Sequence, residues 1–237
     1  MSIALLDKAG LRFWREPELK YRSFVVDTLN GAIQQTLKSQ NRAWDFYQVE
    51  YPMLLPKSMI SAAYTHDDVF FCDASLGDDR AVLRPETTSG SYKFADNILK
   101  TTNSKMPLCV WQVGKSFRVE KADGASASKM RYNEFTQAEW QCIYGLTTMA
   151  DYRAAILAVL PGIVGWLCKV TDKGDVRIVE SDRLPAYSES TMDIEVKRFA
   201  GRWTEVASIS QRKDYPDAKV LEIAFGIDRI VDIAWEY

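Results

Sequence analysis

Residues 109–144, CVWQVGKSFRVEKADGASASKMRYNEFTQAEWQCIY, constrain the fold of this chain more than any other stretch. Hydrophobic and polar side chains alternate over residues 110–117 and again over residues 133–143, and this period of two is typical of β-strands. A polar loop rich in alanine, serine and glycine lies between them. Two such strands joined by a polar loop predict a long antiparallel hairpin around which the chain is organised.

Charged, polar and aromatic side chains gather where the loop of this hairpin begins and ends. They are Arg118, Glu120, Arg131, Glu134, Phe135, Gln137 and Glu139. Because residues two apart on a strand share a face, we expect arginines, carboxylates and a ring together. An arginine holds a phosphate or carboxylate with two hydrogen bonds, and an aromatic ring stacks on a base. A solvated strand face with cross-strand ion pairs is the alternative, and these residues alone leave both interpretations open.

The pattern FRVE, a variable loop and R-x-x-EFTQAE resembles motif 2 of the class II aminoacyl-tRNA synthetases, most closely its glycyl form. The resemblance implies that Arg118 grips the α-phosphate of ATP and the carboxylate of the amino acid, and that Phe135 stacks on adenine. It also implies that Glu120 and Arg131 contact the adenine and the outer phosphates.

Length and composition fit one globular domain spanning residues 1–237. With 237 residues, 47% of them hydrophobic and 12% aromatic, the chain can bury a sizeable core. The formal net charge of −2 excludes a global basic field of the kind that drives non-specific nucleic-acid binding. Any tRNA contact is therefore expected to be local.

The four cysteines are widely spaced without a C-x-x-C pair, and His66 is the single histidine. These counts exclude a zinc finger and favour a reducing, cytoplasmic setting. His66 stands beside Asp67 and Asp68 in a turn-like stretch and is expected at the surface. No stretch approaches the roughly 20 apolar residues of a membrane span, so no membrane partner is expected.

Apolar residues at helical spacing predict an amphipathic helix over residues 20–39, followed by an aromatic strand over residues 44–51 that ends at Pro52. This order resembles motif 1 of the same family, whose helix, strand and proline form a homodimer interface. The helix also carries more apolar residues than one face needs. We therefore expect a homodimer.

The segment VLRPETTSGSY, residues 82–92, could be a rigid turn with an exposed ion pair. It resembles the RPETAQG segment of glycyl-tRNA synthetases, which implies that Glu86 binds the ammonium group of the amino acid. A fixed carboxylate is a suitable partner for an ammonium ion. This chain departs from the family at Thr88 and Ser89, where alanine and glutamine are usual.

Beyond motif 2, residues 149–169 predict a helix broken at Pro161–Gly162, and strands are expected around residues 176–179, 192–197 and 203–209. The run WTEVASIS, residues 203–210, resembles the strand before motif 3 of the family. That resemblance implies that Glu205, with Ser208, holds Mg²⁺ on the ATP phosphates. Outward-facing polar residues of a half-buried strand are the alternative.

The sequence VLEIAFGIDRIVDIAWEY, residues 220–237, predicts a buried strand, a tight turn at Gly226 and an amphipathic helix opening at Asp228. It resembles motif 3, EPSFGIDR in the glycyl family. The resemblance implies that Arg229 grips the γ-phosphate and that Glu222 faces the amino acid, while Ala224 stands in place of a serine.

These features predict an α+β fold, a class II synthetase-like antiparallel sheet flanked by helices. The function implied by the resemblance is ATP- and Mg²⁺-dependent activation of a small amino acid, glycine first, to aminoacyl-AMP, with transfer to tRNA. Two alternatives stay open: a ligase that loads another acceptor, and a non-catalytic accessory protein. The sequence ends soon after motif 3, so no anticodon-binding domain is expected within it.

Overall fold

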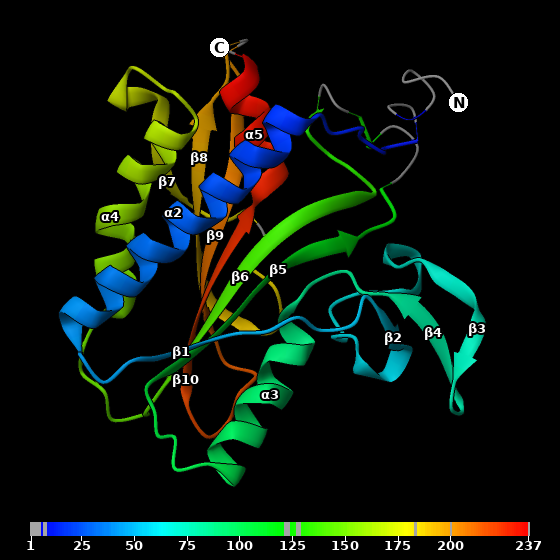
Figure 1. The fold of residues 1–237 in the computed structure, drawn as a ribbon, viewed down its shortest axis with the longest axis vertical. Coiled ribbons are helices and arrows are strands. Elements are labelled where there is room, and N and C mark those ends of the chain that lie inside the picture. Colours follow the sequence, from blue (N-terminus) through cyan, green and yellow to red (C-terminus); the bar gives the residue numbers. More distant parts are fainter. Residues whose placement is uncertain are drawn as a thin grey trace.

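A seven-stranded sheet forms the centre of the fold (Figure 1). The computed structural model describes residue 6 and residues 9–120, 124–126, 129–182, 184–199 and 201–236. In spatial order, the strands are β1 (Asp45–Gln48), β5 (Leu108–Phe117), β6 (Glu134–Tyr144), β10 (Lys219–Gly226), β9 (Trp203–Arg212), β8 (Ser188–Lys197) and β7 (Val176–Glu180). Only β1 runs parallel to its neighbour among these strands, and the other five pairings are antiparallel.

The predicted hairpin is confirmed as β5 and β6. The two strands pair without interruption from Leu108 opposite Ile143 to Phe117 opposite Glu134. Alternation sends Trp111 and Trp140 to one face, where the two rings stack 5.5 Å apart, and sends Gln112 and Glu139 to the other. The hairpin therefore has one apolar face and one polar face.

Three helices cover the apolar face: α2 (Glu16–Gln40), α4 (Tyr152–Leu167) and α5 (Ile227–Glu236) (Figure 1). Helix α2 begins four residues before the predicted helix. Pro17 suits the first turn, and the Glu18 carboxylate accepts the Arg15 backbone N–H at 2.8 Å. The buried side of α2 includes Val25, Leu29 and Ile33.

The expected break at Pro161–Gly162 is wrong, because α4 continues through both residues. Proline removes one intrahelical hydrogen bond and disfavours a helix interior. Leu160, Val164 and Leu167 are fully buried on the same helix, so packing against the core on both sides of Pro161 outweighs the local penalty.

Helix α3 (Thr88–Thr101) lies against the polar face, but covers only one end of it (Figure 1). There Ala95 packs with Leu108, Val110, Ile143 and Val220 from three neighbouring strands. Past the N-terminus of α3, the same face of these three strands carries polar side chains. Gln112, Glu139, Gln141 and Glu222 occupy these positions.

A small second sheet, β2 (Leu54–Pro56), β4 (Asp79–Leu83) and β3 (Phe71–Leu76), was not predicted. Its strands are short, and the pairing of β3 with β4 shifts register between Phe71 and Ser75, which obscures the alternation. Short 3₁₀ segments include Lys57–Met59, His66–Asp68 and Lys173–Asp175. His66 is exposed at the surface, as expected. In the described part of the chain no helix is long and apolar enough to cross a membrane.

Candidate active site

A cavity of about 1420 Å³ opens over the polar face of the large sheet, beyond the end of α3. All ten candidate residues from the sequence line it: Glu86, Arg118, Glu120, Arg131, Phe135, Glu205, Ser208, Glu222, Ala224 and Arg229. They come from segments spread over more than 140 positions of the chain. The fold therefore assembles in one place the residues that four separate motifs contributed.

Strand register explains how the floor of the cavity forms. Glu139 of β6 lies opposite Ala224 of β10, which lies opposite Ser208 of β9, which in turn lies opposite Asp193 of β8. Residues directly opposite in an antiparallel pair share a face, so these four side chains form one row across the sheet.

The segment that carries Glu86 is fastened to the hairpin by Arg84. Its Nε donates to the Lys115 carbonyl oxygen at 2.9 Å, and Nη1 donates to the Tyr51 carbonyl oxygen. The guanidinium crosses β5 at Gly114, where a Cβ atom would lie 2.2 Å from Nη2 of Arg84. Gly114 therefore allows the close approach that brings Glu86 to the cavity.

Arg118 lies between the two ends of the cavity. Its Nε donates to the Pro85 carbonyl oxygen at 3.0 Å, and its Nη2 donates to the Tyr64 hydroxyl at 3.1 Å. The guanidinium also lies 5.2 Å from the centre of the Phe135 ring. Tyr64 in turn donates to Glu86 Oε2 at 3.0 Å, so a continuous chain of contacts joins Phe135 to Glu86.

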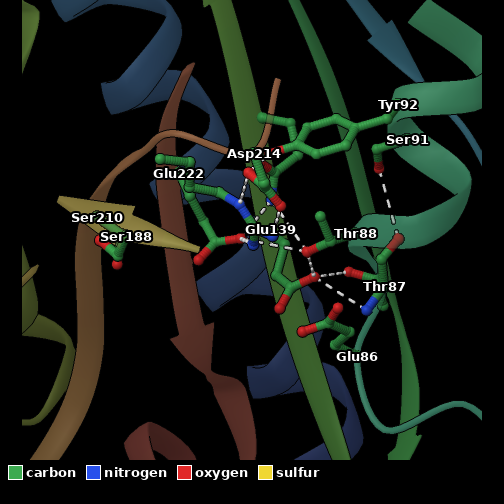
Figure 2. Close-up of polar contacts among 12 residues, drawn as sticks. Glu86, Thr87, Thr88, Ser91, Tyr92, Glu139, Ser188, Ser210, Asp214 and Glu222 are labelled. Carbon is green, nitrogen blue, oxygen red and sulfur yellow. Dashed lines mark hydrogen bonds and ion pairs between the residues drawn. The ribbon is translucent and has the colours of Figure 1, made fainter. Parts of the chain in front are cut away.

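Three buried carboxylates, Glu86, Glu139 and Glu222, lie close together (Figure 2). Glu86 is 5% exposed, Glu139 3% and Glu222 6%. Glu139 Oε2 accepts from the Thr87 N–H at 3.0 Å and from the Thr87 hydroxyl, at the beginning of α3. Donors at a helix N-terminus stabilise an anion, which accounts for the position of Glu139.

Glu222 has different partners from Glu139. Its Oε2 atom accepts from Arg212 Nη1 at 2.5 Å and from Gln141 Nε2 at 2.7 Å. The side chain of Arg212 is itself 1% exposed, and a second ion pair of 2.5 Å binds it to Asp214. Arg212 is therefore shared between two carboxylates.

The electrostatics of this carboxylate cluster, Glu86, Glu139 and Glu222, favour an additional cation. Burial, followed by the charge of Glu139, raises the pKa of Glu86 from 4.5 to about 7, although Arg212 and Arg118 act in the opposite direction. Burial and the charge of Glu222 also raise the pKa of Glu139. Two arginines do not fully balance three carboxylates and Asp214, so a bound positive charge would lower the energy of the site.

The opposite end of the cavity is held by exposed and half-buried residues. Arg131 lies 3.7 Å from Glu120, and Arg229 donates to the Glu205 carbonyl oxygen at 2.9 Å and to the Met130 carbonyl oxygen at 3.1 Å. Exposed ion pairs of this kind are weak, so Arg131 can leave Glu120 for a charged ligand at little cost.

The side chains near Glu205 that could bind a metal ion, Ser208 and Asp193, offer oxygen atoms. Ser208 lies beside it on β9, and Asp193 lies opposite Ser208. Burial raises the pKa of Asp193 to about 6, and its Oδ1 has no hydrogen-bond partner among the described residues. No group of three or more His, Cys, Asp or Glu side chains that could hold a metal occurs in the described part of the chain. Carboxylate and hydroxyl oxygens suit Mg²⁺, which one or two carboxylates hold together with substrate phosphates.

Sequence reasoning gave no role to Tyr64, Glu139 or Arg212. Glu139 was expected on the polar face of the hairpin, and its alternation with Gln137 and Phe135 was the available signal. Arg212 belongs to a strand that extends three residues beyond the predicted end at residue 209. Tyr64 lies between two 3₁₀ segments, where the sequence has no periodicity to place it.

Residues 20–210 match the tRNA synthetases class II core domain (F). The chain belongs to this family. The match covers most of the chain and includes the hairpin β5–β6 as well as the segment that carries Glu86. It confirms the resemblance on which the assignment of motif 2 rested.

Relatives of this class II core are glycine–tRNA ligases. The ligase of Lachnoclostridium phytofermentans is 35% identical over 136 residues, which is 56% of this chain and 28% of that protein. The ligase of Mycoplasma mycoides subsp. mycoides is 34% identical over 151 residues, or 61% of this chain and 32% of that protein. The matches thus span about a third or less of the length of these relatives.

Solved class II synthetases share the fold. Giardia lamblia prolyl-tRNA synthetase in complex with prolyl-adenylate aligns with a TM-score of 0.68 at 17% identity, over 98% of this chain and 51% of that chain. Pyrrolysyl-tRNA synthetase from Desulfitobacterium hafniense aligns with a TM-score of 0.58 at 20% identity, over 88% of this chain and 68% of that chain. The predicted class II fold with its mainly antiparallel sheet is confirmed.

Proposed function

We propose that this chain joins a small amino acid to ATP, giving aminoacyl-AMP and pyrophosphate, and that the aminoacyl group then passes to tRNA. The observation that carries the proposal is the order of groups along one cavity. Phe135 lies 5.2 Å from the Arg118 guanidinium, Arg118 bonds Tyr64, and Tyr64 bonds Glu86 of the buried carboxylate cluster; Arg229 lines the same cavity. The names of the glycine–tRNA ligase relatives support the same class of reaction.

The carboxylate cluster receives the ammonium group of the amino acid. Glu86 and Glu222 were assigned to this role from the sequence, and the burial and position of Glu139 support adding it to them. An ammonium ion supplies the positive charge that three carboxylates and two arginines leave uncompensated. Arg118 is then placed to grip the carboxylate of the same amino acid.

Glycine is the proposed substrate, with alanine or serine next. Carboxylates that crowd around the ammonium group leave little room for a side chain. Ala224 stands beside Glu139 and contributes no hydroxyl, so nothing polar at this position selects a particular substrate. Discrimination against one extra methyl group is worth only about 1–3 kcal/mol even in a well-formed pocket, so rejection of alanine is expected to be modest.

ATP occupies the other end of the cavity. Phe135 stacks on adenine, Glu120 and Arg131 contact the adenine and the outer phosphates, and Arg229 holds the γ-phosphate. Glu205 and Ser208 are proposed to hold Mg²⁺. When bound there, the ion would neutralise charge on the phosphates.

The chemistry requires placement more than a reactive side chain. Arg118 contacts both the amino-acid carboxylate and the α-phosphate, so it brings the attacking oxygen in line with the α-phosphorus. A new P–O bond forms there while the bond to pyrophosphate breaks, and Arg229 stabilises the charge on the departing group. Positioning and charge neutralisation supply most of the rate enhancement in such transfers, which explains why a nucleophilic side chain is unnecessary.

We also propose that the protein is a homodimer of the cytoplasm. Phe24 and Leu19 on α2 are 45% and 44% exposed, which leaves apolar surface on the helix that the motif 1 resemblance assigns to a two-fold interface. All four cysteines are free, which suits a reducing compartment.

Charging of total tRNA by the purified protein, with labelled amino acids, tests the acceptor. Labelled glycine on tRNA is the expected result. Aminoacyl-AMP formed without any charged tRNA would contradict tRNA as the acceptor and favour a ligase that loads another molecule.

A further inference from the structure

Thr88, the first residue of α3, joins two members of the carboxylate cluster (Figure 2). Its hydroxyl oxygen lies 3.3 Å from Glu139 Oε2 and 3.2 Å from Glu222 Oε2. Gln141 Nε2 donates to the same hydroxyl oxygen at 3.2 Å. Thr88 is 2% exposed and does not line the cavity. Thr88 therefore contacts the carboxylates without forming part of the cavity wall.

The hydroxyl of Thr88 limits where the two carboxylates can lie. A threonine hydroxyl carries one proton, so it donates to either Glu139 or Glu222 at a given moment, while Gln141 satisfies one of its lone pairs. The two carboxylates therefore share one proton, which offsets part of their mutual repulsion and favours their lying side by side. Without this hydroxyl, Glu139 keeps its bonds to Thr87 and Gln137, and Glu222 keeps those to Arg212 and Gln141, but the two carboxylates no longer share a donor.

The contacts of Thr88 also bear on which carboxylate oxygen is available to a ligand, because Oε1 of Glu139 already accepts from Gln137 Nε2. Glu139 and Glu222 both use Oε2 to contact Thr88. Arg212 and Gln141 also bind Oε2 of Glu222, and Oε1 of Glu222 has no hydrogen-bond partner among the described residues. Because Glu222 lines the cavity, Oε1 is its atom available to a ligand.

We propose that Thr88 is a positioning residue for the ammonium group of the amino acid. Its hydroxyl holds Glu139 and Glu222 at a separation that allows one ammonium ion to bind between them. The inference rests on the proposed adenylation of a small amino acid and adds a residue that acts through the carboxylates. Thr88 is a departure from the motif that this segment resembles, in which alanine occupies this position.

Three substitutions, compared in two pairs that include the wild type, separate the effect of the hydroxyl from that of side-chain shape. Thr88 and Thr88→Val have nearly the same shape, and Thr88→Ser and Thr88→Ala form a smaller matched pair. In each pair only the first member has a hydroxyl. The measurement is amino-acid-dependent exchange of labelled pyrophosphate into ATP with glycine, giving kcat and the KM values for glycine and for ATP.

We expect KM for glycine to follow the hydroxyl. The Val and Ala variants should show KM for glycine about tenfold above their hydroxyl-bearing partners, since a hydrogen bond to a charged group is worth at least this factor. KM for ATP and kcat should change less than about twofold. Thr101→Val is the control, because the Thr101 hydroxyl lies on the same helix and bonds only the Asn97 carbonyl oxygen at 2.6 Å. It should leave all three values unchanged.

The outcomes distinguish this inference from the proposed function. Exchange by the wild type with an unchanged KM for glycine in Thr88→Val and Thr88→Ala overturns the positioning role alone. A KM for glycine that differs between the larger and the smaller side chains, and not between variants with and without the hydroxyl, also overturns it. So does a fall in kcat together with a rise in both KM values. Absence of exchange by the wild type with every amino acid overturns the proposed function and this inference with it. If Thr88→Val does not fold, the comparison of Ser with Ala decides.

Discussion

Replacing Glu86 by glutamine is expected to make the protein more stable and less able to bind its amino acid. The carboxyl is 5% exposed, and burial together with Glu139 raises its pKa from 4.5 to about 7. Glutamine keeps the shape and removes the charge. It resembles the protonated carboxyl, which the folded chain prefers.

The sign of the stability change follows from proton binding. Because the folded-state pKa is raised, the contribution of Glu86 to stability is full below pH 4.5 and is lost as pH rises through about 7. One pKa unit corresponds to about 1.4 kcal/mol, so ionising this carboxyl in the folded chain costs about 3 kcal/mol above pH 7. Glu86→Gln should therefore unfold with a free energy up to about 3 kcal/mol higher at pH 8, with a much smaller gain at pH 4.5.

Urea unfolding at both pH values measures this difference, and Asp67→Asn serves as the control because Asp67 is 90% exposed. The same variant should show a higher KM for glycine in pyrophosphate exchange, since one of the three charges that face the ammonium group is gone. Equal stability differences at pH 4.5 and pH 8 would refute the argument from burial. An unchanged KM would refute the assignment of Glu86 to the ammonium group.

Three further predictions concern catalysis, assembly and the fold. Arg118→Ala or Arg229→Ala should each reduce pyrophosphate exchange by about 100-fold, because each removes a preorganised phosphate contact worth about 3 kcal/mol; a change below threefold would count against these roles. Light scattering at micromolar concentration should give twice the 27.0 kDa chain mass, and the mass of one chain would contradict the homodimer. Pro161→Ala should raise the free energy of unfolding by about 2 kcal/mol, the helix penalty of proline less its entropic benefit, and a destabilised variant would show that Pro161 is needed where it stands.

The parts of the fold that the sequence predicted are those with long, regular patterns. Strands β5 and β6 pair over ten residues in an unbroken register, and α2 carries buried residues at helical spacing over most of its length. Strand register then brings Glu222 and Ala224 next to the hairpin that supplies Phe135. Local pattern and motif order were sufficient for these elements.

The rest depended on contacts between distant segments. Pro161 marked a helix break locally, but the buried residues on both sides keep α4 intact. The cluster around Glu222 needs Arg212, whose role comes from a 2.5 Å contact across the site and has no motif of its own. Tyr64 reaches Glu86 and Arg118 from a segment without periodicity. Such contacts follow from tertiary packing, which a single sequence does not specify residue by residue.

Pyrophosphate exchange measured with each of the twenty amino acids tests the central claim most directly, because it reports adenylation without requiring an acceptor. The wild-type protein should exchange label into ATP with glycine as the best substrate, with alanine or serine next and with leucine and phenylalanine inactive. Fastest exchange with a large amino acid would contradict the small ammonium-binding pocket. No exchange with any of the twenty would contradict the enzymatic function and favour a non-catalytic accessory protein.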